Sequence, residues 1–193
     1  MQQQQMEVNP RGIPKAPFVE NVEDHVSEQE PVEIVLKKFQ EATAKYKFME
    51  MNHLTRKRNL DAKIPEIRKT LEMVQFLETE ANNGDDGTKE IETMYELNDT
   101  LYATAKIKPT GKVCLWLGAN VMLEYPVEEA AELLASKLSA ALKTLKNTEE
   151  DLAYLRDQIT TMEVNTARVY NWDVKQRRLA RAKAEAVDAA GLD

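Results

Sequence analysis

Residues 112–126 read KVCLWLGANVMLEYP, and this stretch decides how the rest of the chain must be arranged. Apolar side chains fill nearly every position on both sides of Gly118, Ala119 and Asn120, which predict the turn of a β-hairpin. A strand with one face in water alternates apolar and polar residues, whereas these two strands do not. The hairpin therefore needs cover on both of its faces.

The composition predicts a helix-rich protein that works inside the cell. Of its 193 residues, 31% are charged and 42% hydrophobic, with 6 glycines and 7 prolines. The net charge of −7 does not favour a nucleic-acid partner. The single cysteine, Cys114, excludes an internal disulfide framework, and we expect it to be a small buried residue of a strand. No leader and no membrane-spanning apolar run is evident, so we expect a cytoplasmic protein without a membrane partner.

Two long segments carry mostly apolar residues at alternating steps of three and four, the spacing of a coiled-coil seam. The first segment has one stutter, where two steps of four follow each other at Leu60 and Ile64. In residues 32–83 the seam positions are Val35, Phe39, Ala42, Tyr46, Met49, His53, Arg56, Leu60, Ile64, Ile67, Leu71 and Val74. In residues 127–180 they are Ala131, Leu134, Leu138, Ala141, Leu145, Thr148, Leu152, Leu155, Ile159, Met162, Thr166, Val169, Asp173 and Gln176. Helices of this length, about 75 Å at 1.5 Å per residue, exceed a compact domain of this size. We expect them to pack as one antiparallel coiled coil, which keeps both stripes out of water.

Residues 88–126 lie between the helices and predict up to four short strands, with turns near 98–100, 109–111 and 118–120. The fold class is therefore mainly α with a small β insert: two long helices in an antiparallel coiled coil, joined by two β-hairpins. The insert would lie at the closed end of the helical hairpin, and both chain termini at the open end. Prolines in residues 1–31 exclude one continuous helix there and predict an extended, partly disordered arm, with a helical turn in residues 19–26. Residues 181–193 are predicted to be a flexible tail.

A doubly apolar hairpin would aggregate if it stayed uncovered. Copies of the same insert in other chains can cover it, and the alternative is that one face packs on the chain's own helix ends. The residues predicted to mediate oligomerisation are Leu97, Leu101, Ile107, Val113, Leu115, Trp116, Leu117, Val121, Leu123 and Tyr125.

Apolar residues also gather where the arm, the start of the first helix and the end of the second would meet. They are Phe18, Val19, Val32, Val35, Phe39, Val169, Tyr170 and Trp172. One hypothesis is that this cluster binds apolar segments of another protein. The alternative is that the arm folds back over Tyr170 and Trp172 and buries them.

No catalytic constellation is evident, and the sequence predicts neither an enzyme nor a metal or cofactor site. His53 on the first seam, with Arg56, indicates a polar layer in the coiled coil rather than a catalytic base or a metal ligand. The KPTGK of residues 108–112 predicts a turn rather than a phosphate loop. The RKR of residues 56–58 could belong to an RNA-binding arm, but residues 32–83 carry 10 basic and 8 acidic residues, which favours a solvated helix face.

Several stretches resemble the α-type subunits of the prefoldin family, those of eukaryotes in particular. They are RGIPKAPFVENVED (11–24), KYKFMEMN (45–52), IPEIRKTLE (64–72), LWLGANVMLEYPVEEAAELL (115–134) and DQITTMEVNTARVYNWDVKQR (157–177). The resemblance covers about residues 11–178.

This resemblance implies a hexamer of two α-type and four β-type prefoldin subunits. In such a hexamer the hairpins form a shared double β-barrel, and the coiled coils project from it. Their tips would hold unfolded proteins, notably actin and tubulin, and deliver them to the cytosolic chaperonin without ATP. The alternative, from another class, is a coiled-coil scaffold or tethering protein without chaperone activity, whose sheet merely dimerises it.

Overall fold

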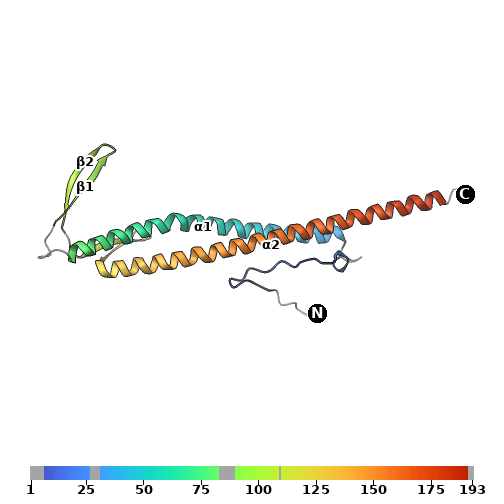
Figure 1. Ribbon diagram of the computed structural model, residues 1–193, viewed down its shortest axis with the longest axis horizontal. Coiled ribbons are helices and arrows are strands. Elements are labelled where there is room, and N and C mark those ends of the chain that lie inside the picture. Colours follow the sequence, from blue (N-terminus) through green and yellow to red (C-terminus); the bar gives the residue numbers. More distant parts are fainter. Residues whose placement is uncertain (1–6, 27–30, 83–89, 109, 191–193) are drawn as a thin grey trace. The chain divides into compact units, whose positions relative to one another are not determined.

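The structure is a computed structural model and describes residues 7–26, 31–82, 90–108 and 110–190. Two long helices, with two β-hairpins between them in chain order, confirm the predicted fold class (Figure 1). The elements are the 3₁₀ turn η1 (Val22–Asp24), α1 (Val32–Asn82), β1 (Ile91–Asn98), β2 (Leu101–Ile107), β3 (Lys112–Gly118), β4 (Val121–Pro126) and α2 (Val127–Ala190). The 3₁₀ turn falls inside the segment predicted to be helical.

The chain forms two compact units, and both helices contribute to each. The arm unit consists of Met1–Lys57 and Asn147–Asp193, and the hairpin unit consists of Arg58–Lys146.

The predicted seams are the buried faces of both helices. All the seam positions of α2 are buried or half-buried, and so are those of α1 except Arg56, which is exposed. In the arm unit, ion pairs cross between the helices from Lys47 to Glu163 (2.9 Å), Glu50 to Arg156 (3.4 Å) and Lys57 to Glu149 (2.7 Å). Partner numbers fall along α2 as they rise along α1, so the paired stretches are antiparallel.

The observed helix bounds differ from the predicted ones mainly at the end of α2. The helix continues to Ala190, beyond the predicted end at residue 180. The final segment lacks an apolar stripe, but its alanines, arginines, lysine and glutamate are strong helix formers. Propensity therefore extends the helix past the point where the seam ends.

In the hairpin unit, one face of the β3–β4 hairpin packs on the chain's own helices. Its core consists of Val74, Leu115, Val127, Ala130 and Leu134, with Ile67, Leu71, Val113, Tyr125, Ala131 and Leu133 packed around it. Leu115 points into this core and keeps only 9% of its surface exposed. The hairpin is thus a third layer over one face of the helix pair.

The turn between β3 and β4 explains the sequence at its centre. The pairing of Gly118 with Val121 leaves Ala119 and Asn120 as a two-residue loop. Both residues have positive φ, 49° and 61°. A two-residue turn with positive φ at both positions matches the right-handed twist of the two strands that it joins. Asparagine tolerates this left-handed conformation well and Gly118, at φ 94°, adopts a related one without steric hindrance. The predicted turn is confirmed.

In the arm unit, the described part of the arm is the third layer. Ile13 and Ala16 join the core formed by Tyr46, Leu155, Ile159 and Met162, and Val19 is completely buried. The arm runs in the same direction as α2, because residues 9, 16 and 19 contact Asp151, Gln158 and Asn165 in that order. The arm thus folds back onto the helices, as the alternative predicted, but it does not bury Tyr170, which is 59% exposed, and it leaves Trp172 half-buried.

Most hydrogen bonds between the later part of the arm and the helices reach the arm's main chain. Gln158 accepts from the Ala16 amide (2.8 Å), and Asn165 accepts from the Val19 amide (3.0 Å) and donates to the Pro17 carbonyl (2.6 Å). Arg168 donates to the Val19 carbonyl (2.8 Å), and the Tyr46 hydroxyl to the Pro14 carbonyl (3.1 Å). Burial raises the pKa of Tyr46, which keeps this hydroxyl protonated as a donor.

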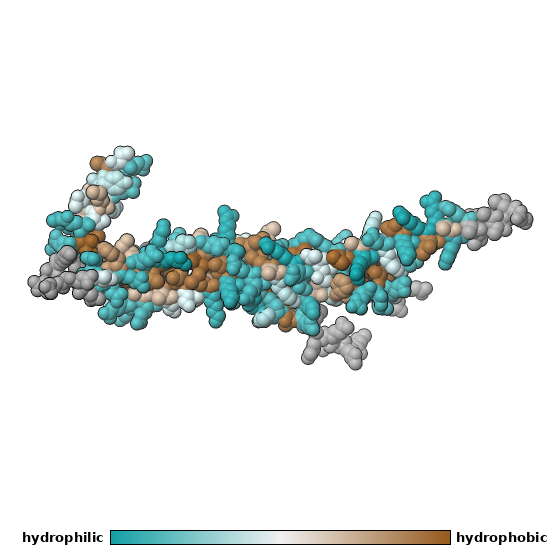
Figure 2. All heavy atoms as spheres, viewed as in Figure 1, coloured by the Kyte–Doolittle hydropathy of each residue, from teal (hydrophilic) through white to brown (hydrophobic). Residues whose placement is uncertain are grey.

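The helical surface is mainly polar. On the face seen in Figure 2, polar side chains cover most of the helices, and apolar ones show along the line where the helices meet. Within the described residues, neither helix has a stretch apolar enough to cross a lipid bilayer.

We expect Asn165→Ala to lower the free energy of unfolding by about 1–3 kcal/mol, because it leaves the buried Val19 amide and the part-buried Pro17 carbonyl without their partner. Asn171→Ala, the same change at an exposed position of α2, should alter it by less than about 0.5 kcal/mol. Urea unfolding followed by circular dichroism measures both. Equal stability of the two variants would show that Asn165 does not hold the arm.

Candidate interaction surfaces

The second face of the β3–β4 hairpin is apolar and uncovered by this chain. Trp116 and Met122 are cross-strand partners on it and keep 60% and 56% of their surfaces exposed. Only its base is polar, where Lys112 and Glu124 form an ion pair of 2.7 Å. The hydrogen bond to Glu124 raises the pKa of Lys112. Beyond this base, the face presents apolar groups to whatever lies next to it.

The β1–β2 hairpin has one apolar and one mixed face. Ile91, Tyr95, Ala103, Ala105 and Ile107 share the first face. The opposite face carries the cross-strand ion pair of Glu92 and Lys106 (3.0 Å), together with the exposed Met94 and Tyr102. Almost every side chain of this hairpin is exposed in the single chain. A two-stranded hairpin with so little contact is marginal in water, so it too requires a partner.

The ten residues predicted to mediate oligomerisation fall into two groups. Val113, Leu115 and Tyr125 pack on the chain's own helices. The others are exposed: Leu97, Leu101, Ile107, Trp116, Leu117, Val121 and Leu123. Part of the helix-facing side of β3–β4 therefore packs on the chain's own helices, as the second explanation predicts. Trp116 on the opposite face, and Leu117, Val121 and Leu123 toward the turn, remain uncovered by this chain. Sequence reasoning missed Met94, Tyr95, Tyr102 and Met122, although their alternation along the strands could have indicated them.

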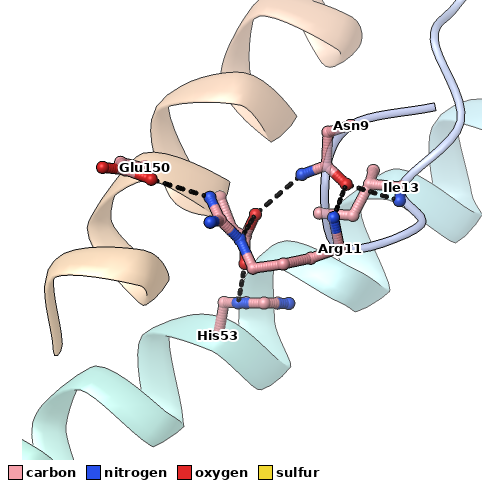
Figure 3. A network of polar contacts seen from close by, with 6 residues as sticks. Asn9, Arg11, Ile13, His53 and Glu150 are labelled. Carbon is pink, nitrogen blue, oxygen red and sulfur yellow. Dashed lines mark hydrogen bonds and ion pairs between the residues drawn. The ribbon is translucent and has the colours of Figure 1, made fainter. Parts of the chain in front are cut away.

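A second candidate surface is the arm with the helices beneath it, and a buried carboxylate holds the arm's first turn. Asp151, only 3% exposed, accepts hydrogen bonds from Asn9 (2.7 Å) and from Arg11 (2.6 Å). Arg11 also bonds Glu150 at 3.1 Å (Figure 3). The bond to Asp151 raises the pKa of the Arg11 guanidinium above its usual value. We call Asn9 and Arg11, with Glu150 and Asp151, the latch.

The arm is shaped locally for this contact. The side-chain oxygen of Asn9 accepts from the amides of Arg11 (3.0 Å) and Ile13 (2.8 Å), and its carbonyl accepts from the amide of Gly12 (3.0 Å). Gly12 has a φ of +85°, which a residue with a side chain rarely adopts. These bonds make a tight turn that brings Asn9 and Arg11 together over Asp151.

His53 lies beneath the latch, as a half-buried residue of α1. Its Nδ1 is 3.9 Å from the second oxygen of Asp151. The predicted polar layer at His53 is confirmed, and its partner is Asp151 on α2, whereas Arg56 is exposed. In the RKR stretch, Lys57 pairs with Glu149 across the helices, as on a solvated coiled-coil face.

The side chains predicted to bind another protein differ widely in exposure. Phe18 and Tyr170 are exposed at 53% and 59%. Val32, Phe39 and Trp172 are half-buried, whereas Val19, Val35 and Val169 are buried. The Arg168 guanidinium lies 4.6 Å from the centre of the Phe18 ring, so it stacks on a ring whose other side is open.

The prediction that Cys114 is a buried residue is wrong. Cys114 is exposed, because it lies on the same face of β3 as Trp116, opposite the face that packs on the helices. Strand membership was correctly predicted, but which face meets the helices depends on packing that a doubly apolar pattern does not reveal.

Comparisons with known proteins agree with this architecture. Residues 46–172 match the family model described as "Prefoldin: Prefoldin subunit". The chain therefore belongs to the prefoldin subunit family, a family of chaperone components.

Within this family the chain is similar to prefoldin subunit 3 of eukaryotes, as its sequence motifs predicted. It is 59% identical to "Prefoldin subunit 3" of Elsinoe fawcettii over 90% of this chain and 86% of that protein. It is 52% identical to the human protein of that name (86% and 83%) and 46% identical to that of Saccharomyces cerevisiae (89% of each). A solved structure, "Cryo-EM structure of filamentous PFD from Methanocaldococcus jannaschii", aligns with a TM-score of 0.49 at 20% identity, covering 65% of this chain and 98% of that one.

Two cross-strand partners on the helix-facing side of β3–β4 differ in burial, so the same substitution should affect them differently. Leu115→Ala should lower the free energy of unfolding by about 2–4 kcal/mol, because it empties a packed position of the core. Leu123→Ala, opposite it on β4 and 47% exposed, should lower it by less than about 1 kcal/mol in the isolated chain. Thermal unfolding of the two variants compares them. A larger loss for Leu123→Ala would mean that the hairpin packs differently.

Proposed function

We propose that this chain is the α-type subunit of a heterohexamer that contains two α-type and four β-type prefoldin subunits. The observation that carries the proposal is the uncovered apolar face of β3–β4, centred on Trp116 and Met122. A second apolar face, on β1–β2, adds to it. Side chains of this kind are stable in water only against matching strands from other subunits. The two hairpins would thus belong to a shared β-barrel platform.

We further propose that the arm unit holds unfolded proteins without catalysing a reaction and without ATP. Phe18 and Tyr170 offer apolar groups at its surface, and the helices beneath the arm bind main-chain atoms. Contacts of this size are weak singly. Several arm units on one platform would raise the local concentration for the next contact, so a captured protein is retained by many reversible bonds.

In this proposal the clients are of the actin and tubulin class, and release delivers them to the cytosolic chaperonin in the cytoplasm. Sequence resemblance to α-type prefoldin subunits supports these clients and this partner. Weak, multiple contacts support transfer by competition, since a receiver with a larger interface can replace them one at a time.

Assembly is tested by Trp116→Lys. A lysine on this face would place a charge against apolar strands, so the variant should fold alone but fail to join the hexamer. Leu142→Lys, at a comparably exposed apolar position of α2 in the same unit, should assemble normally. Native mass measurement of each chain mixed with β-type subunits gives the composition. A homodimer that ignores the β-type subunits would instead indicate a scaffold or tethering protein.

Holding is tested by the double variant Phe18→Ser with Tyr170→Ser in the assembled hexamer. We expect it to capture at least about threefold less unfolded actin, because an exposed apolar contact is worth on the order of 1 kcal/mol. Phe76→Ser, which removes an exposed aromatic ring from α1 in the hairpin unit, should capture as much as the native hexamer. Undiminished capture by the double variant would remove Phe18 and Tyr170 from the binding surface.

A further inference from the structure

We propose that the surface of α1 and α2 beneath the arm is a binding site for an extended polypeptide, and that the arm is its resident ligand. An extended segment of an unfolded protein would take the same place when the arm leaves. This inference rests on the proposed holding function and names the site and the ligand chemistry for it. We call this surface the arm groove, and its polar residues are Tyr46, Gln158, Asn165 and Arg168.

The first argument is that the arm groove binds main chain rather than particular side chains. All five of its hydrogen bonds to residues 14–19 end on amides or carbonyls of the arm. Asn165 bonds one of each, as a primary amide can because it both donates and accepts. Every polypeptide offers these groups, so the bonds are available to any extended segment with a free amide at the right place.

The second argument is that the bonding residues of α2 and their partners on the arm are spaced equally in space. Gln158 and Asn165 are seven residues apart, which is about 10.5 Å along a helix at 1.5 Å per residue. Their partners Ala16 and Val19 are three residues apart, which is about 10 Å in an extended chain. The two spacings are therefore nearly equal, and the polar residues of the arm groove can bind an extended chain over several residues.

The side-chain demands of the arm groove are few. Ile13, Ala16 and Val19 enter it at every third position and are 6%, 5% and 0% exposed. Phe18 and Lys15, which lie between them, face outward and are exposed. A ligand thus needs a small or apolar residue at every third position, a condition that many segments of unfolded proteins meet.

The third argument is that an empty groove exposes apolar surface. With the arm in place, Asn165 and Gln158 are 0% and 7% exposed, and Ile13 and Ala16 cover Leu155, Ile159 and Met162. A departing arm would place these apolar side chains in water, so the entry of another chain that covers them and bonds the amides is favourable. Seven residues beyond Asn165, Trp172 carries a buried indole N–H without a hydrogen-bond partner in the described part of the chain. A segment longer than the arm's contact can supply a carbonyl there.

The latch is the part of the contact that belongs to the arm alone. It joins side chains, Arg11 and Asn9 to Asp151 and Glu150, and lies before the first main-chain bond of the groove. It can be broken without altering any residue of the groove. The arm also has the advantage of a tethered ligand, whose effective concentration is on the order of millimolar.

The test compares the full-length chain with Arg11→Glu, which places an acid against Asp151 and Glu150. The probe is a fluorescent peptide with the sequence of residues 12–21, which lacks both latch residues of the arm. Anisotropy should show about tenfold tighter binding to Arg11→Glu than to the native chain, the effect of losing one charge-assisted hydrogen bond from the competing arm. Lys175→Glu, the same charge change at an exposed position of α2, should bind the peptide like the native chain.

Three further changes test main-chain recognition. Asn165→Ala added to Arg11→Glu should weaken peptide binding about tenfold. A peptide methylated on the nitrogen that corresponds to Val19 should lose about as much, because it cannot donate to Asn165. A peptide of different sequence that keeps apolar residues at the three groove positions should bind within about threefold of the original. Failure of that peptide, with the original still binding, would make the groove specific for the arm and overturn the proposal.

Hydrogen exchange at the Ala16 and Val19 amides shows whether the arm has left. Fast exchange of these amides in Arg11→Glu, without a gain in peptide binding, overturns the proposal. Continued protection of the amides in the double variant Asn9→Ala with Arg11→Glu also overturns it. If Arg11→Glu does not fold, Arg11→Ala replaces it, because it removes the Arg11 bonds without adding an acid. Arg11→Ala should also bind the peptide more tightly than the native chain.

A binding experiment on the assembled complex distinguishes this inference from the proposed function. Its ligand is labelled carboxymethylated lactalbumin, a permanently unfolded protein. The Arg11→Glu complex should bind it several-fold more tightly than the native complex, and the added Asn165→Ala should remove the gain. Equal binding by both complexes would overturn the groove as a client site and leave the holding function standing. No binding by either complex would overturn the holding function and this inference with it.

Discussion

A pair of α-helices can bury only one stripe of each partner, and this limit decides what the rest of the chain must do. Side chains next to the seam stay half in water unless a third segment covers them. In the hairpin unit that segment is β3–β4, through Leu115 and its neighbours. In the arm unit it is the stretch from Ile13 to Val19. Each unit thus obtains a three-layer core from a chain that has only two long helices.

The two third layers differ in what is added to their apolar contacts. Leu115 and its neighbours meet the helices through apolar side chains, which remain in place as long as water is excluded. The arm makes apolar contacts too, through Ile13, Ala16 and Val19, and adds hydrogen bonds to its main chain, whose groups are present in any polypeptide. Apolar packing suits a permanent platform, whereas main-chain bonding suits a contact that one extended segment can exchange for another.

Sequence periodicity predicted the helices, the seams and the turn at Ala119 and Asn120, because each depends on neighbours in the chain. The latch depends on residues 139 or more positions apart, and nothing in the sequence of the arm indicates which residues of α2 they meet. One signal was available: Asp151, Gln158, Asn165 and Trp172 recur every seven residues beside the seam of α2. Polar residues at one heptad position indicate a bonded third segment, although not which segment.

Exchange of a ligand at the arm groove is governed by the latch more than by the groove itself. Groove bonds are equal for the arm and for a competing chain, so they cancel when one replaces the other. What remains in the arm's favour is its tether and the bonds of Arg11 and Asn9 to Asp151. A client with several suitable segments can offset the tether by binding several arm units at once. Capture would then favour long unfolded chains over short peptides, since only the former reach more than one groove.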